Sequence, residues 1–157
     1  MDETTARIDF EKVASGVYGA ISRLDGATTK LANEAGLEPP LRELIRIRAS
    51  LLNGCAYCVD MHTKDARKAG ESEQRLYAVP VWRETPFFSD RERAALAFTE
   101  VVTLMADTHV PSAAWEEAAA VFSEPEMAAL LSLILTINAW NTIGVGTRAW
   151  LPGSYEP

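Results

Sequence analysis

Apolar residues recur along this chain at the spacing of α-helices. Between residues 10 and 35 they fall at steps of three and four, at Phe10, Val13, Val17, Ile21 and Leu24, which predicts an amphipathic helix. A second run with the same period covers residues 41–52. Pro39 and Pro40 lie between the two runs. Because proline cannot occupy a helix interior, the segment 36–40 is expected to separate two helices.

The second run is followed by a turn and a third helix. Asn53 and Gly54 predict the end of the second helix and a sharp turn of the chain. A further helix is expected from about Cys55 to Ala69, with Gly70 at its C-terminal end. If the turn reverses the chain, these two helices run antiparallel and their side chains meet.

The second half of the chain contains shorter segments of the same kind. A short helix is expected from residue 72 and another over residues 113–122. Between them, residues 79–88 are expected to form a loop in which Trp82 and Phe88 are tucked against the core.

Two capping boxes mark the starts of longer helices. In each, a serine precedes a glutamate by three residues, so that the two side chains satisfy free N–H groups of the first turn. The pairs are Ser89 with Glu92 and Ser123 with Glu126. The second pair opens a long helix expected over about residues 126–149.

The sequence shows no alternating strand pattern and no internal repeat, so it predicts an all-α fold. We expect about seven helices in a single domain that spans residues 1–157. The helix over 126–149 is apolar on nearly every side and therefore needs burial on every side. Two explanations remain open: it is the central helix of the bundle, or part of it forms a subunit interface in a homo-oligomer.

Composition narrows the class of protein. Apolar residues make up 48% of 157 residues, enough for the core of one domain. The net charge is −7 and no cluster of Lys and Arg is present, which argues against binding to nucleic acid or to anionic membranes. The first ten residues do not resemble a signal peptide, and the apolar stretch 127–137 is too short to span a bilayer. We therefore expect a cytoplasmic protein.

The segment 53–62, NGCAYCVDMH, holds both cysteines and one of the two histidines. On a helix, at about 100° per residue, Cys58 and His62 lie about 60° and about 20° from Cys55 in one direction, so all three share a face. His62 follows Cys58 by four residues, close enough for the imidazole to accept the thiol proton. The C-x-x-C spacing at a helix N-terminus can close a disulfide, and the helix dipole there stabilises a thiolate.

A carboxylate is expected beside this histidine. In an antiparallel hairpin Glu43 lies opposite about residue 65, one helical turn from His62. A carboxylate that orients a histidine, which in turn activates a thiol, repeats the logic of catalytic triads. Such a relay is expected to lower the pKa of Cys58. The nearby Arg46 and Arg48 are expected to form salt bridges.

Metal binding is the competing interpretation of the cysteine segment. The motif C-x-x-C-x-x-x-H offers three zinc ligands, but the chain has no third cysteine, and His109 would have to come from a distant segment. Haem attachment requires a histidine directly after the second cysteine, where this chain has Val59. Neither a metal nor another cofactor is expected.

The pattern E-x11-C-x-x-C-x-x-x-H resembles that of the AhpD-like alkylhydroperoxidases of the carboxymuconolactone decarboxylase superfamily. The resemblance is strongest over the core segment 41–70 and extends over about residues 8–155. It implies an all-α fold, assembly into trimers or hexamers, and a thiol peroxidase that uses neither metal nor haem. Tyr57 occupies a position that varies between His and Tyr in the family.

The resemblance also implies a role for each residue of the motif. Cys58 attacks the hydroperoxide, and its proton leaves through His62 and a water molecule to Glu43. Cys55 then captures the sulfenic acid as a disulfide, which an external dithiol or thiol protein reduces. Two other hypotheses remain open: a dithiol–disulfide exchange protein for which peroxide is not the main substrate, and a non-catalytic oligomeric scaffold.

Overall fold

The computed structural model describes residues 5–157 and confirms the all-α fold. Within this range it contains nine α-helices, one 3₁₀-helix and no strand. The helices are α1 (Phe10–Val13), α2 (Ser15–Glu34), α3 (Pro39–Asn53), α4 (Ala56–Lys68), α5 (Glu73–Ala78), η1 (Val79–Glu84), α6 (Asp90–Thr103), α7 (Met105–Thr108), α8 (Ser112–Ala119) and α9 (Glu124–Thr147).

The count exceeds the expected seven mainly because short helical turns precede or follow longer helices. The helix expected over 10–35 is interrupted at Ala14, where the backbone leaves the helical region (φ −126°, ψ 39°), so α1 and α2 are separate. The expected loop over 79–88 is wrong in part, because Val79–Glu84 forms the 3₁₀-helix η1. Trp82 and Phe88 are buried there as predicted.

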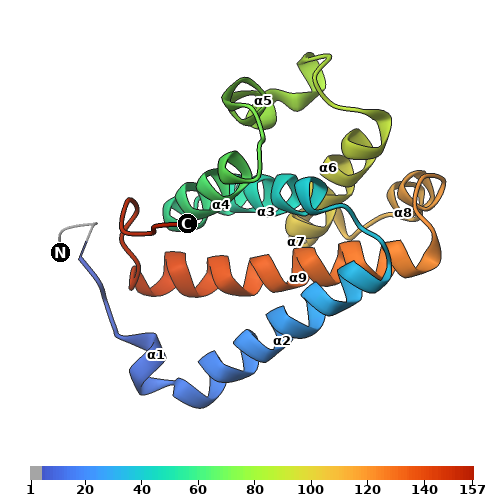
Figure 1. Ribbon diagram of the computed structural model, residues 1–157. Helices are drawn as coiled ribbons and strands as arrows, with labels where there is room; N and C mark the ends of the chain where they lie inside the picture. Colours follow the sequence, from blue (N-terminus) through green and yellow to red (C-terminus); the bar gives the residue numbers. More distant parts are fainter. Residues whose placement is uncertain (1–4) are drawn as a thin grey trace.

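Helix α9 runs through the middle of the molecule (Figure 1). It packs against α2 on one side and against α3 and α6 on the other, with further contacts to α4 and α8. Within residues 5–157 it is the single helix long and apolar enough to cross a membrane by length and composition, but its packing is that of a core helix. It is not buried on every side, since Leu131, Leu135 and Val145 are exposed.

The main core lies where α3, α6 and α9 meet. Its members are apolar side chains spaced one helical turn apart on each helix, among them Leu41 and Ile45 on α3, Phe98 on α6, and Leu130 and Ile134 on α9. Burying a side chain of this size contributes about 1.5–3 kcal/mol. This core fixes the relative position of α3 and α9, the two helices against which the cysteine segment packs.

The two capping boxes start α6 and α9 as predicted. The N–H of Ser89 donates to the Glu92 carboxylate at 2.7 Å, and the N–H of Glu92 donates back to the Ser89 hydroxyl at 3.2 Å. The Glu126 carboxylate accepts the N–H of Ser123 at 2.8 Å. Helix α9 therefore begins at Glu124 and ends at Thr147, two residues before the expected limits at each end.

The hairpin formed by α3 and α4 carries the candidate site. Helix α3 begins with both prolines in its first turn, where a missing N–H costs nothing. It ends at Gly54, whose left-handed backbone (φ 68°) reverses the chain with little strain. The N–H of Cys55 donates to the Ser50 carbonyl at 2.9 Å and closes the turn. The two helices pack closely along their length, so the predicted antiparallel hairpin is confirmed.

Candidate functional site

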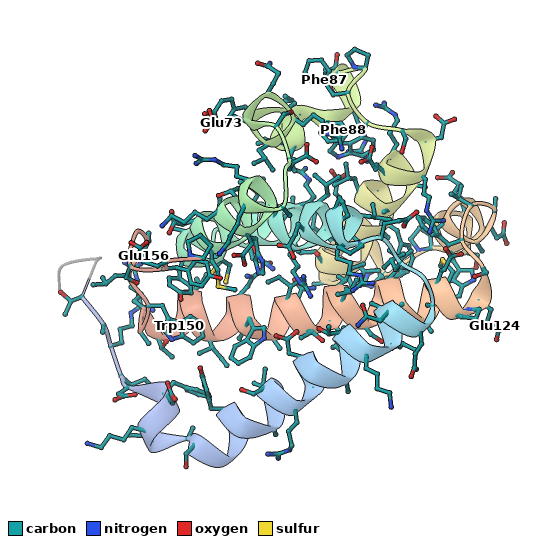
Figure 2. The ribbon with its side chains drawn as sticks, viewed as in Figure 1. Glu73, Phe87, Phe88, Glu124, Trp150 and Glu156 are labelled. Carbon is teal, nitrogen blue, oxygen red and sulfur yellow. The ribbon has the colours of Figure 1, made fainter. Side chains whose placement is uncertain are left out.

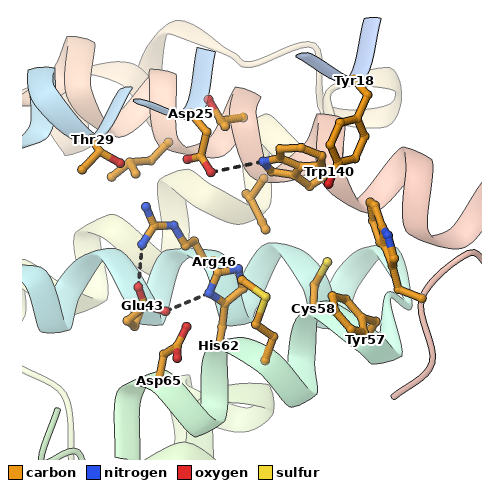
Figure 3. A pocket seen from close by; sticks show the side chains of 15 residues that line it. Tyr18, Asp25, Thr29, Glu43, Arg46, Tyr57, Cys58, His62, Asp65 and Trp140 are labelled. Atoms are coloured by element: carbon orange, nitrogen blue, oxygen red, sulfur yellow. Dashed lines mark hydrogen bonds and ion pairs between the residues drawn. The ribbon is translucent and has the colours of Figure 1, made fainter. Parts of the chain in front are cut away.

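The cysteine segment borders a cavity of about 350 Å³ between α2, α3, α4 and α9 (Figure 3). Cys58, Met61, His62 and Asp65 of α4 form one wall and Glu43 and Arg46 of α3 the next. Residues of α2, α9 and the C-terminal segment complete the lining: Tyr18, Asp25, Thr29, Leu133, Thr136, Ile137, Trp140 and Trp150, together with Tyr57 beside Cys58. The lining combines aromatic and aliphatic side chains with several ionisable ones, so the cavity can hold a small molecule and present acid–base groups to it.

Both cysteines are almost completely buried in reduced form. Cys58 is 4% exposed and Cys55 2% exposed. They pack with Ala49 of α3 and Ile137 of α9. Cys55 is not within α4 as expected but is the residue immediately before its first turn.

Glu43 and His62 lie together as the predicted hairpin requires, but they are in direct contact and not joined through the water molecule that the family resemblance implies. The Nδ1 atom of His62 lies 2.9 Å from Oε2 of Glu43, and Nη1 of Arg46 donates to the other carboxylate oxygen at 2.5 Å (Figure 3). Burial disfavours the ionised form of Glu43, but its hydrogen bonds and charge interactions with His62 and Arg46 outweigh burial and lower its pKa. Arg48 is also paired as expected, with Glu100 at 2.8 Å.

The Glu43 contact fixes how His62 can act. Because the ionised carboxylate only accepts hydrogen bonds, Nδ1 of His62 must carry the hydrogen that joins them. In neutral His62 the free lone pair is then on Nε2, on the opposite edge of the ring. His62 is 7% exposed, lines the same cavity as Cys58, and follows it by one turn of α4. The pair is therefore arranged to accept a proton inside the cavity.

The electrostatics of the two thiols differ from the sequence prediction. The hydrogen that the Cys58 thiol directs at the Cys55 sulfur lowers the pKa of Cys55 to about 7, against an opposing effect of burial. The N–H groups of Tyr57 and Cys58 at the start of α4 lower it further, although neither makes a capping hydrogen bond of standard geometry.

The prediction that the pKa of Cys58 is lowered is wrong for the reduced pair. The neighbouring Cys55 sulfur and burial raise the pKa of Cys58, because two thiolates in contact repel each other and only one ionises readily. In the reduced pair Cys55 therefore ionises first, and Cys58 keeps its proton.

Sequence reasoning missed Asn141 of α9. This side chain is 1% exposed, accepts a hydrogen bond from Nδ2 of Asn53 at 2.9 Å, and donates through its own Nδ2 to the Ser50 hydroxyl at 3.0 Å. It also faces both sulfurs and favours their ionised forms. The available signal was an asparagine interrupting the most apolar segment of the chain.

The potential metal ligands that lie close together in the described residues are Glu43, His62 and Asp65, all within 4.8 Å, and no cysteine is among them. Glu43 is already engaged by Arg46 and His62, and Asp65 accepts the hydroxyl hydrogen of Tyr155 at 2.8 Å. These contacts fit a hydrogen-bonded relay better than a metal site. His109 follows α7 and does not line this cavity, so the structure does not assemble the four-ligand zinc site.

Comparison with known proteins places these features in a wider group. A sequence profile of the Carboxymuconolactone decarboxylase family matches residues 16–101. The uncharacterised protein YdfG of Bacillus subtilis is 42% identical over 122 residues, which cover 76% of this chain and 83% of YdfG. The uncharacterised YnjA of Escherichia coli is 34% identical over 98 residues, 62% of this chain and 53% of YnjA.

A solved structure has nearly the same fold. It is that of ATU0492 from Agrobacterium tumefaciens, a protein of unknown function and a candidate antioxidant defence protein AhpD. The two structures agree with a TM-score of 0.86 at 39% sequence identity, over 94% of this chain and 99% of that chain.

Proposed function

This chain belongs to the carboxymuconolactone decarboxylase family, and from that membership and the geometry of its cavity we propose that it is a thiol peroxidase that reduces hydroperoxides. The observation that carries the proposal is the shared cavity: Cys58 opens into the same space as the Glu43–His62 pair. The AhpD-like fold, which it shares with a candidate antioxidant defence protein, supports the same chemistry.

In the proposed first step, Cys58 attacks the terminal oxygen of the hydroperoxide. The thiol proton passes to Nε2 of His62, whose Nδ1–H is held by Glu43. The O–O bond breaks, Cys58 becomes a sulfenic acid, and the leaving alkoxide takes a proton to become the alcohol. Because the pKa of Cys58 is raised in the resting pair, the thiol needs a base at the moment of attack, which is the task assigned to His62 and Glu43.

In the second step, the Cys55 thiolate attacks the sulfenic sulfur of Cys58. A disulfide forms, and the sulfenic hydroxyl leaves as water after taking up a proton. Cys55 suits this role because its pKa is lowered to about 7, so about half of it is ionised near neutral pH. An external dithiol then supplies two electrons and returns both cysteines to thiols.

A second candidate function is dithiol–disulfide exchange with another protein or thiol compound. The lowered pKa of Cys55 favours it, because an ionised first cysteine beside a protonated second one is the arrangement of C-x-x-C oxidoreductases. In this function Cys55 attacks an external disulfide, and Cys58 resolves the mixed disulfide.

We further propose a cytoplasmic location and a homo-oligomer, with a trimer or hexamer preferred from the family resemblance. The exposed stripe of α9 that includes Leu131 and Leu135 supports an interface, since both leucines remain outside the core. No role in binding nucleic acid or membranes is proposed, consistent with the net charge of −7.

A coupled assay tests the proposal. Consumption of hydrogen peroxide and cumene hydroperoxide is measured with dithiothreitol as the reductant, for wild type, Cys58→Ser and Cys55→Ser. We expect turnover by wild type only, and a dimedone adduct on Cys58 in Cys55→Ser. If wild type reduces an external disulfide but neither peroxide, the exchange function replaces the peroxidase. If the thiols of the native protein react with neither peroxide and with no external disulfide, the scaffold hypothesis holds.

A further inference from the structure

The two cysteines open into different cavities. Cys58 lines the cavity that contains Glu43 and His62, and Cys55 does not. Cys55 instead lines a second cavity of about 440 Å³, and Cys58 is absent from its lining. The other residues of this second cavity are Gly54, Ala56, Tyr57, Gly144, Val145, Arg148, Trp150, Leu151 and Pro152.

Two aromatic side chains form the wall between the cavities. Tyr57 and Trp150 line both, and their ring centroids lie 5.5 Å apart. Figure 2 shows Trp150 at the C-terminal end of α9, opposite the end marked by Glu124. The segment after α9 is tied to α4: the N–H of Gly153 donates to Asp60 at 2.9 Å, and the Tyr155 hydroxyl donates to Asp65 at 2.8 Å.

The second cavity has its own chemistry. Its lining is apolar apart from one thiol, one phenol and one cation, Arg148, and it includes no carboxylate. Arg148 follows the last turn of α9 in the left-handed backbone region (φ 52°), an uncommon conformation for a residue with a side chain. No ion pair with Arg148 occurs within residues 5–157. A cation that has no carboxylate partner among the described residues and lies beside an apolar cavity suits an anionic ligand with an apolar body.

We propose that the second cavity is the entrance for the reductant: a thiol compound that bears a carboxylate binds there, places its carboxylate at Arg148, and attacks the sulfur of Cys55. The proposal rests on the proposed function in that it assumes a Cys55–Cys58 disulfide. Hydroperoxide would then reach the Cys58 thiol and the reductant would reach the Cys55 sulfur of the disulfide, each through its own cavity, and neither would have to leave before the other enters.

The exchange balances as follows. The thiolate of the reductant forms a bond to Sγ of Cys55 while the Cys55–Cys58 bond breaks, and the electron pair leaves with Cys58. On the Cys58 side, the proton released by the reductant thiol reaches the departing thiolate through solvent and Nε2 of His62. A second thiol then attacks the mixed disulfide, which releases the Cys55 thiolate and the oxidised reductant. Leaving-group pKa alone would favour attack on Cys58. Proton delivery from His62 offsets this, and a reductant in the second cavity meets Cys55 and not Cys58.

The test uses full-length protein oxidised to the disulfide with diamide, so that it does not depend on peroxide. Reduction by 3-mercaptopropionate and by its neutral amide is followed through tryptophan fluorescence, because Trp150 lies between the cavities. The ratio of the two rates is compared among wild type, Arg148→Asn, which retains a residue that accepts the left-handed conformation, and Arg148→Lys, which keeps the charge. Arg23→Gln, an exposed arginine of α2, is the control for a general loss of positive charge.

We expect the carboxylate-to-amide rate ratio to fall about two- to fivefold in Arg148→Asn, the range for a partly exposed ion pair, and to remain unchanged in the other two variants. Quenching with N-ethylmaleimide and mass spectrometry should place the thiol adduct on Cys55. An unchanged ratio in Arg148→Asn, or an adduct on Cys58, overturns the proposal. If diamide forms no disulfide, both the entrance proposal and the proposed peroxidase function are wrong. If the protein consumes no peroxide but the rate ratio falls in Arg148→Asn, the peroxidase function is wrong and the second cavity still serves as the reductant entrance for dithiol exchange.

Discussion

A single methyl group at Gly144 is the sharpest perturbation that this site offers. The residue lies on α9, where the helix passes the redox pair. A Cβ atom at this position would lie 2.9 Å from Sγ of Cys55 and 3.4 Å from the ring of Trp150. The backbone of α9 therefore needs glycine here, because the sulfur occupies the space of a side chain.

The size of the effect follows from this distance. Non-bonded heavy atoms pack best at about 3.5–4.0 Å, so Gly144→Ala must displace the Cys55 sulfur by at least about 0.6 Å. Overpacking of this kind costs about 1–3 kcal/mol, and the higher helix propensity of alanine returns about 1 kcal/mol. We expect a net loss of about 0–2 kcal/mol in the free energy of unfolding. Displacing the sulfur also disturbs its hydrogen bonds with Cys58 and the start of α4, so the pKa of Cys55 should shift from about 7.

Gly146 supplies the matched control, since a Cβ atom there meets nothing within 4 Å. Gly146→Ala should be neutral or slightly stabilising and should leave the pKa of Cys55 unchanged. Urea unfolding gives the stability of each variant, and the pH dependence of iodoacetamide alkylation, read on Cys55 by mass spectrometry, gives its pKa. If Gly144→Ala and Gly146→Ala behave alike in both measurements, the close approach of the sulfur to α9 is refuted.

Four further outcomes are expected. Cys58→Ala removes the thiol hydrogen that most lowers the pKa of Cys55. Alkylation of Cys55 should therefore slow at pH 7 and match the wild-type rate above about pH 9. A pH–rate curve whose midpoint stays near pH 7 would contradict this. His62→Gln should slow peroxide reduction about 10²–10⁴-fold, and Glu43→Gln should slow it less. Equal rates for wild type and both variants would exclude the relay. Glu43 has a lowered pKa in the folded state, so it stabilises the fold above its unfolded pKa and loses this effect as the pH falls through the folded value. Glu43→Gln should therefore cost about 1–3 kcal/mol at pH 7 and progressively less under acid in urea unfolding. Leu135→Asp should lower the mass measured by light scattering, and a wild-type mass near 17.2 kDa would disprove the oligomer.

The sequence determined the helical frame and most of the motif geometry, because these depend on local spacing. Helix starts at the capping serines, and the reversal at Gly54, follow from the backbone chemistry of a few adjacent residues. Once that reversal was assigned, the helical rise placed Glu43 within about one turn of His62. Their direct 2.9 Å contact, with no water molecule between them, came from the tertiary structure. The sequence could also place both cysteines at the start of α4.

The charge distribution of the redox pair required the tertiary structure. Local spacing suggested that His62 would lower the pKa of Cys58, but the hydrogen of Cys58 and the start of α4 favour ionisation of Cys55 instead. That preference depends on the contact between the two sulfurs at the start of α4. Both thiols also interact with Asn141, which comes from a helix more than eighty residues further along the chain. Electrostatic effects of this kind act over a few ångströms in space, so no pattern of neighbouring residues reveals them.

The separation of the two cavities was likewise decided only by the fold. Tyr57 and Trp150 are 93 positions apart in the sequence (150 minus 57) yet form one wall, because α9 ends beside the start of α4 and the following segment is fastened to α4. Whether Cys55 faces the same space as Cys58 depends on where that wall stands. A helical period fixes which residues share one face of one helix, whereas the packing of distant helices decides which solvent-filled space each face adjoins.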